Sequence, residues 1–352
     1  MLLLCGLSTH MSVRHHLQPP MLAVGYASSS IARAKPTRCR SGHFDNTLQS
    51  ILEKAKTLGP RSAVASCIGD LNEIFMPQLN ARISAAETSK SGDLAQLREV
   101  ARAMEEIYSP ATDDEEVDEV EQAHWQCVDE ALDAHWQASD GMIDEEEAAL
   151  VDASAGAETF AFERPSTYGE VTRAGARQLF KAMGLRRARN AVFADVGSGA
   201  GRLVAQAWLE MPSLRALGVE LAPSRHAAAE RAWASVLQSG AAEAFELDRP
   251  GGGPEYRLAS MLEADFSTVT HIYVASLCMP CELMDAFWER LMSSAPELQC
   301  VATLRPFRAD GAAAALSHVS HVETTWDSDG SSTELFIYWL SSNKECGTVR
   351  KS

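Results

Sequence analysis

The sequence lacks any hydrophobic run that approaches the roughly 18 residues of a membrane-spanning helix, so we expect no membrane span. It also lacks a dense cysteine framework. Eight cysteines are scattered over 352 residues, which indicates free thiols in a reducing compartment. With 46% hydrophobic residues, the chain can still bury a core. Its length predicts one large domain with extensions, or two domains.

Charge of one sign is missing from two stretches. Residues 1–44 contain no Asp or Glu and five Lys or Arg, a composition typical of an organellar transit peptide and equally of a disordered basic tail. Residues 113–158 contain 17 acidic residues and no Lys or Arg. Because the whole chain has 48 acidic and 31 basic residues, charge is balanced outside this segment. The net charge of −17 therefore says little about the partner of the remaining chain.

The order of these stretches predicts five regions. We expect a basic tail or transit peptide over 1–44, a helical region over 45–110, an acidic linker passing into a helix over 111–158, a main domain over 159–342 and a tail over 343–352. In the helical region, apolar residues recur at helical spacing over 45–58, over 63–86 with an interruption at Pro77, and over 93–108. These helices are expected to pack on the main domain or on a partner.

The most informative stretch runs from Ala191 to Gly201. A short apolar run ends at Asp195, and glycines follow at alternate positions, Gly197, Gly199 and Gly201. Apolar residues then recur at helical spacing, so the pattern predicts a buried strand, a tight loop and the start of a helix. Glycine permits the sharp turn and a close approach of a ligand to the backbone. The N–H groups at the helix start favour an anionic or polar ligand group.

A second apolar run closes at Glu220, nineteen residues beyond Gly201. A carboxylate at this place can accept hydrogen bonds from both hydroxyls of a ribose. Dinucleotides and S-adenosylmethionine both use this layout, but the dinucleotide fingerprint is Gly-x-Gly-x-x-Gly, whereas Arg202 follows Gly201 here. With Asp195 two positions before the first glycine, the spacing fits an S-adenosylmethionine loop better. A glycine-rich turn in another kind of α/β domain is the alternative.

From Phe160 onward, strand and helix patterns alternate. Further strands are expected over 214–220, 256–261, 271–277 and 298–304, and helices between them. Two final strands, over 318–326 and 333–340, flank a short turn and predict an antiparallel hairpin. The fold class is therefore α/β, with a Rossmann-like, mostly parallel sheet of the class I methyltransferase type that ends in an antiparallel hairpin. An α-helical N-terminal extension precedes it.

Several motifs then occur in a particular order, namely Tyr168-Gly169-Glu170, Asp195-Val-Gly-Ser-Gly-Ala-Gly201, Gly218-Val-Glu220, Ala264-Asp265-Phe266, Ile272-Tyr-Val274 and Arg305-Pro306-Phe307. In this order and spacing, the sequence resembles the non-SET histone-lysine methyltransferases of the disruptor-of-telomeric-silencing type. The resemblance covers roughly residues 160–340 and not the first 150. The glycine loop is common to many methyltransferases, and the Tyr-Gly-Glu and Asp-Phe elements make the match more specific.

The resemblance implies S-adenosyl-L-methionine as cofactor and no metal. It implies that the Tyr168-Gly169-Glu170 loop closes over the methionine end of the cofactor, and that this end and the ribose are lined by Asp195, Gly197, Ser198, Gly199 and Arg202. Glu220 would hold the ribose hydroxyls, Asp265 would accept from the adenine amino group, and Phe266 would pack near the ring. Alternatives stay open, since Asp265 could cap a helix, Phe266 could be core and Tyr168 could be a loop aromatic.

The sequence departs from the family on the acceptor side. Val171 stands where the family typically has Thr, and Ala275-Ser276-Leu277 stands where it has Asn-Asn-Phe beside the acceptor-lysine channel. We predict Ser276 and Tyr168 as catalytic residues, with Ser276 touching either the methyl donor or the nucleophile. Cys278 and Cys281 form a single Cys-x-x-Cys, interpreted as structural or pocket-lining, with redox modulation or half of a zinc site as alternatives.

The resulting hypothesis is an S-adenosylmethionine-dependent methyltransferase of the histone-lysine type, acting on a histone or another lysine-bearing protein. The alternatives are an RNA or small-molecule methyltransferase, and a non-catalytic scaffold of the same fold. No dense basic stripe supports nucleic-acid binding, although Arg186-Arg187-Ala-Arg189 keeps it open. The resemblance implies a nuclear location, whereas the basic N-terminus implies a location in a plastid or mitochondrion. Two Ala-His-Trp-Gln repeats, at 123–126 and 134–137, are expected to pack through their tryptophans rather than to bind metal.

Overall fold

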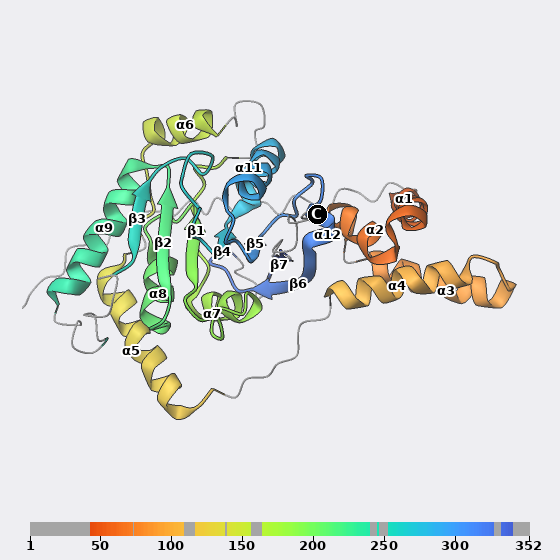
Figure 1. Cartoon of the computed structure of the whole chain (residues 1–352), viewed down its shortest axis with the longest axis horizontal. Coiled ribbons are helices and arrows are strands. Elements are labelled where there is room, and N and C mark those ends of the chain that lie inside the picture. Colours follow the sequence, from red (N-terminus) through yellow and green to blue (C-terminus); the bar gives the residue numbers. More distant parts are fainter. Residues whose placement is uncertain are drawn as a thin grey trace, which may run out of the picture. The chain divides into compact units, whose positions relative to one another are not determined.

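The computed structural model (Figure 1) describes residues 43–72, 74–108, 117–137, 139–155, 164–239, 245, 253–326 and 332–340. All of them belong to one unit of the chain, Ser41–Ser352. The predicted basic tail over 1–44 and the tail over 343–352 lie almost wholly outside these ranges. Within them, seven strands form a single sheet in the order β3-β2-β1-β4-β5-β7-β6.

β1 (Val192–Val196) is the central strand around which the other elements are ordered. Every residue of β1 is buried, as expected for a strand covered on both faces. It pairs in parallel with β2 (Arg215–Glu220) on one side and with β4 (His271–Val274) on the other. The strands that follow β1 in the chain thus lie first on one side of it (β2) and later on the other (β4). At such a switch point, open α/β sheets bind ligands beside the carboxyl ends of the strands.

The remaining strands extend the sheet at both sides. β3 (Glu255–Leu258) lies parallel to β2, and β5 (Cys300–Thr303) lies parallel to β4. β7 (Thr333–Trp339) runs antiparallel to both β5 and β6 (Leu316–Val322). The predicted fold class, a mostly parallel Rossmann-like sheet that ends in an antiparallel hairpin, is confirmed. The hairpin's own turn lies outside the described residues.

Helices cover both faces of the sheet (Figure 1). One core group joins the sheet to α5 (Glu119–His135), α7 (Arg173–Ala182), α8 (Arg202–Glu210) and α9 (Pro223–Gln238). The second core group, on the opposite face, includes α11 (Cys281–Ser294) and α12 (Ala312–Ala315). α9 begins at Pro223, because the fixed φ of proline suits the first helical position.

The helical extension packs against this second core group. It consists of α1 (His43–Leu58), α2 (Pro60–Ser66), the 3₁₀ turn η1 (Ile68–Asp70), α3 (Phe75–Ser89) and α4 (Leu94–Tyr108). The Arg61 guanidinium of α2 donates to the carbonyl oxygens of Leu316 (2.9 Å) and Ser317, the first two residues of β6. The expected break at Pro77 is wrong, because the chain breaks between α2 and α3 and Pro77 lies in the first turn of α3. There its missing N–H costs no helical hydrogen bond.

The described residues of the acidic stretch belong to the same unit. They form α5 and α6 (Glu145–Ser154), whose N-cap aspartates, Asp118 and Asp144, each accept a backbone hydrogen bond in the first turn. His124 of α5 bonds to the carbonyl oxygen of Leu209, and His135 to the hydroxyl of Ser235. Both histidines of the repeats therefore tie α5 to its neighbouring helices.

Two absences concern the described part of the chain. No described helix is long and apolar enough to cross a membrane. The described residues contain no group of three or more His, Cys, Asp or Glu that could hold a metal ion. The described cysteines, namely Cys67, Cys127, Cys278, Cys281 and Cys300, are not joined in disulfide bonds.

Candidate functional site

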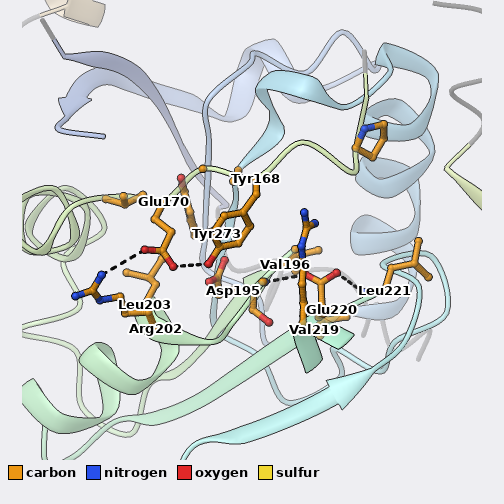
Figure 2. Close-up of a pocket in the computed structure, with 18 of the residues that line it drawn as sticks. Tyr168, Glu170, Asp195, Val196, Arg202, Leu203, Val219, Glu220, Leu221 and Tyr273 are labelled. Carbon is orange, nitrogen blue, oxygen red and sulfur yellow. Dashed lines mark hydrogen bonds and ion pairs between the residues drawn. The ribbon is translucent and has the colours of Figure 1, made fainter. Parts of the chain in front are cut away.

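A cavity of about 440 Å³ lies at the carboxyl ends of β1, β2 and β4 (Figure 2). Its volume is in the range of ordinary small-ligand sites. Its wall combines the glycine loop after β1, the loop before α7, the ends of α5 and α6, and the segment after β3. The lining residues used below are Asp133, Val151, Ser154, Tyr168, Glu170, Asp195, Gly197, Ser198, Gly199, Arg202, Glu220, Arg225, Tyr273, Ala275 and Met279.

The glycine loop forms the floor next to β1. Gly199 (φ 54°) and Gly201 (φ 76°) both adopt the left-handed conformation that other residues rarely take. A Cβ on Gly199 would lie 2.6 Å from the Tyr168 ring, so the loop also needs glycine for close packing. The Gly197 and Ser198 N–H groups donate to the carbonyl oxygen of Val219 (2.8 and 3.1 Å). The loop is thereby fastened to β2, and α8 starts directly after it at Arg202.

Glu220 ends β2 and is only 5% exposed. Its Oε2 accepts from the Gly199 N–H (2.7 Å), while Oε1 accepts from the N–H groups of Leu221 (2.9 Å) and Ala222 (2.8 Å). Each carboxylate oxygen can accept about two hydrogen bonds. In this arrangement Glu220 has one acceptor position left, on Oε2. It can serve one ribose hydroxyl rather than the two that the sequence predicted.

Asp195 is the next-to-last residue of β1 and is 4% exposed. Burial, followed by the nearby carboxylates of Glu220 and Glu170, raises its pKa to about 8. A cationic group bound beside Asp195 would favour its ionised form again. The position therefore suits a ligand with an ammonium or sulfonium group.

The loop that carries Tyr168, Gly169 and Glu170 covers one side of the cavity. The Tyr168 hydroxyl donates to Glu170 in a short contact, and Arg202 bridges Glu170 (3.5 Å) and Asp133 of α5 (3.0 Å). Figure 2 shows Glu170 between Tyr168 and Arg202. Burial and then the Glu170 carboxylate raise the pKa of Tyr168, so its hydroxyl stays protonated. These contacts join the predicted loop to the glycine loop.

Arg225 of α9 holds the segment around Gly141, which the sequence analysis assigned to the acidic linker and helix over 111–158. The Arg225 guanidinium of α9 lies 5.0 Å from the Tyr168 ring centroid and donates to the carbonyl oxygens of Gly141 (2.8 Å) and Ser166 (2.6 Å). A Cβ on Gly141 would fall within 1.8 Å of the Tyr168 ring. Tyr168 is therefore enclosed between Gly141 and Gly199. Arg225 has a recognisable position, three residues into the helix after Glu220, but its charge alone did not distinguish it.

Three predicted site residues lie outside the cavity wall. Asp265 is exposed, and its carboxylate accepts from the Ser267 N–H (2.9 Å), which lowers its pKa. Phe266 is 1% exposed and packs on Phe287, with ring centroids 5.7 Å apart. Asp265 thus caps a local turn and Phe266 belongs to the core, and neither lines the cavity.

Ser276 is also displaced from its expected role. It is fully buried, and its hydroxyl accepts from the N–H groups of Leu304 (3.1 Å) and Arg305 (2.9 Å). Tyr273 of β4 and Ala275, which follows the strand, line the cavity. Ser276 starts the 3₁₀ turn η3 (Ser276–Cys278) and anchors the end of β5. Its side chain does not line the cavity.

The Cys278–Cys281 pair adopts a conformation that excludes a disulfide. Met279 (φ −90°, ψ 137°) and Pro280 (φ −56°, ψ 144°) are both extended. Extended chain spans roughly 3.3 Å per residue, which puts the two cysteine Cα atoms about 9–10 Å apart, beyond the ~7 Å limit for a disulfide. Met279 lines the cavity between them. The structure favours the structural or pocket-lining interpretation.

Comparison with known families finds one match at this place in the chain. Residues 150–240 match the family described as "Histone methylation protein DOT1". This match confirms the resemblance, and it spans the Tyr168 loop, the glycine loop and Glu220. The chain is an S-adenosylmethionine-dependent methyltransferase. Among curated proteins, nothing matches it.

Solved structures similar to this methyltransferase are distant in sequence. An RNA methyltransferase from Salinibacter ruber in complex with S-adenosyl-L-homocysteine is 18% identical, with 49% of this chain and 93% of that chain covered and a TM-score of 0.34. Magnesium protoporphyrin IX methyltransferase from Synechocystis with bound SAM is 12% identical, with 58% and 100% covered and a TM-score of 0.35. TrmN from Thermus thermophilus is 19% identical, with 54% and 53% covered and a TM-score of 0.33.

Proposed function

We propose that the methyltransferase transfers a methyl group to a lysine side chain of a histone or histone-like protein. The observation that carries this proposal is the match of residues 150–240 to the histone methylation family. A nuclear location and a role in chromatin regulation accompany a histone substrate and are part of the same proposal.

The acidic side chains of the cavity wall suit the ammonium group and the ribose of the cofactor. Asp195 is suited to the methionine ammonium, and Glu220 keeps one acceptor position for a ribose hydroxyl. A Cβ at Gly199 would collide with the Tyr168 ring, so glycine at this position lets Tyr168 pack directly on the glycine loop. We assign cofactor binding to Tyr168, Gly169, Glu170, Asp195, Gly197, Ser198, Gly199, Arg202 and Glu220.

The chemistry asks the protein mainly for positioning. When bound, S-adenosylmethionine supplies a methyl group that its sulfonium already activates. The chain must align a neutral amine in line with that methyl group. A free lysine has a pKa of about 10.4, and burial in the cavity lowers the pKa of an entering amine. Tyr168, held by Glu170, closes the wall on this side and excludes water.

The charge around the cavity supports a protein rather than RNA as acceptor. α6 lines the cavity with Val151 and Ser154, and the same helix starts with the exposed residues Asp144, Glu145 and Glu146. Phosphate backbones bind through Lys and Arg, so this rim repels a polyanion. A basic protein segment is electrostatically complementary to it.

The proposal is tested by labelled methyl transfer to separated acceptor pools. The protein is incubated with methyl-labelled S-adenosylmethionine and, in parallel, with histone octamers, nucleosomes, total RNA and a small-molecule extract. We expect label in histone, recovered as methyl-lysine after acid hydrolysis, and its loss in Asp195→Asn but not in the distant variant Arg98→Met. Label in RNA or small molecules overturns the lysine assignment, and cofactor binding without transfer to any pool favours the scaffold.

A further inference from the structure

Tyr273 brings a buried hydroxyl to the cavity and has no role in the site described so far. It lies on β4 directly opposite Asp195 of β1 in the parallel register. Both side chains line the cavity (Figure 2). Tyr273 is 1% exposed, and its hydroxyl has no hydrogen-bond partner among the residues that the structure describes.

A buried hydroxyl without a partner is costly and unusual in a native protein. Two other buried or half-buried tyrosines of this domain show the normal situation. The Tyr338 hydroxyl accepts from the Phe307 N–H (3.0 Å), and the Tyr256 hydroxyl donates to the Gly201 carbonyl oxygen (3.2 Å). Since the unpartnered Tyr273 hydroxyl borders a ligand-sized cavity, it indicates that a ligand supplies the partner.

The strand order decides which part of the ligand lies there. Glu220, which faces the ribose in the proposed function, ends β2, and Tyr273 lies on β4. β1 with Asp195 separates the two. Tyr273 is thus on the side of Asp195 away from the ribose. An ammonium bound by Asp195 belongs to an amino acid whose carboxylate is attached to the same carbon atom, within reach of a donor beside Asp195.

Resting on the proposed function, we infer that Tyr273 is a cofactor-specificity residue whose hydroxyl donates to the carboxylate at the amino-acid end of S-adenosylmethionine. Burial and then the Asp195 carboxylate raise the pKa of Tyr273 well above its usual value, so its proton stays available for donation. Ala275, which follows β4 and also lines the cavity, contributes only a methyl group. Tyr273 is therefore the polar contribution of β4 to the cavity.

The test compares two ligands that differ in the amino-acid end. S-adenosylhomocysteine carries it, and 5′-methylthioadenosine lacks it. By calorimetry, Tyr273→Phe is expected to weaken the binding of S-adenosylhomocysteine about tenfold, or about 1.4 kcal/mol. The affinity for 5′-methylthioadenosine should be unchanged. The control Tyr338→Phe removes a buried hydroxyl outside the cavity and should change neither affinity.

Thermal unfolding separates this effect from damage to the fold. Tyr273→Phe removes no hydrogen bond of the free protein, so its Tm should stay equal or rise, whereas Tyr338→Phe strands the Phe307 N–H and should lower the Tm. If Tyr273→Phe loses affinity for both ligands equally, or for neither, the inference is overturned while the proposed function stands. Failure of the unsubstituted protein to bind S-adenosylhomocysteine overturns the proposed function, and the inference with it.

Discussion

The Oε2 atom of Glu220 accepts a hydrogen bond from the Gly199 N–H at 2.7 Å. This bond joins the end of β2 to the glycine loop that follows β1. The other oxygen of Glu220 accepts from the two residues that lead into α9. One carboxylate thus fixes two loops of the cavity and still presents an acceptor to a ligand. Its structural and binding roles cannot be separated by a single substitution.

Glu220→Ala is expected to lower both stability and cofactor affinity. It leaves three buried N–H groups without an acceptor, each worth about 1–3 kcal/mol. Glu220→Gln keeps one carbonyl oxygen but turns an amide donor toward one of the N–H groups, so its unfolding free energy should lie between those of Ala and the unsubstituted protein. Chemical denaturation and calorimetry with S-adenosylhomocysteine measure the two effects. Unchanged stability and affinity in Glu220→Ala would remove this residue from the site.

Cofactor binding is expected to release a proton from Asp195. The pKa of Asp195, about 8 in the free protein, falls when an ammonium binds beside it. Affinity should therefore rise from pH 6 to about pH 8 and then level off. At pH 7, calorimetry in two buffers of different ionisation enthalpy should report release of close to one proton. Asp195→Asn should bind more weakly and show neither the buffer dependence nor the pH dependence, and a buffer-independent heat for the unsubstituted protein contradicts this account.

The same residue affects stability with a definite sign. Because the pKa of folded Asp195 is above its unfolded value, its contribution to stability is fully present below about pH 4. That contribution is lost as pH rises through about 8. A bound cationic ligand opposes the loss. The Tm gained on adding S-adenosylhomocysteine should accordingly be larger at pH 8 than at pH 6, and Asp195→Asn should remove the difference.

The central part of the fold could be predicted from sequence because its signals are local. The run from Ala191 to Gly201 specifies a strand, a left-handed turn and a helix within eleven residues. Glu220 follows from the same pattern on the next strand. The alternation of apolar runs then locates the parallel strands along the chain, and the short turn before Thr333 indicates the hairpin.

The rest of the site depends on contacts that sequence spacing does not encode. The acidic stretch has no basic residue of its own, and its partners Arg173, Arg177 and Arg202 come from α7 and α8. Gly141 is fixed by Tyr168 and Arg225, which are distant in the chain. For Ser276, the motif placed the residue at the end of a strand but did not tell which way its side chain points. The 3₁₀ turn that starts at Ser276 decides the direction of its hydroxyl.

Gly141→Ala is expected to displace Tyr168. The new Cβ would lie within 1.8 Å of the Tyr168 ring, and the ring cannot retreat because Gly199 lies on its other side. Stability should fall by about 1–3 kcal/mol, the usual cost of overpacking, with cofactor affinity reduced as well. Gly92→Ala, where a Cβ meets nothing within 4 Å, is the control. In the double variant with Tyr168→Ala the stability cost of Gly141→Ala should vanish, and persistence of the full cost shows that Tyr168 is not its cause.

A buried ion pair fastens α5, and with it Asp133, to the methyltransferase domain. Arg177 of α7 donates to Glu210 of α8 (2.8 Å) and to Asp129 of α5 (2.7 Å), and its guanidinium lies 4.6 Å from the Trp125 ring centroid. The Glu210 side chain is only 4% exposed. Burial raises the pKa of Glu210, and Arg177 lowers it in part.

Arg177→Met is expected to destabilise the protein by about 3–5 kcal/mol, because it leaves the Glu210 carboxylate buried without its cation. The pKa of Glu210 then rises further, and since a raised folded pKa costs stability as pH increases, the loss should be greater at pH 8 than at pH 5. Adding Glu210→Gln should recover part of the stability and remove this pH dependence. Arg98→Met is the matched control, because its pair with Glu87 is exposed at 60% and 46% and should cost less than about 1 kcal/mol. Urea denaturation at both pH values measures all three variants beside the unsubstituted protein, and equal losses for Arg177→Met and Arg98→Met would show that the buried pair does not hold α5.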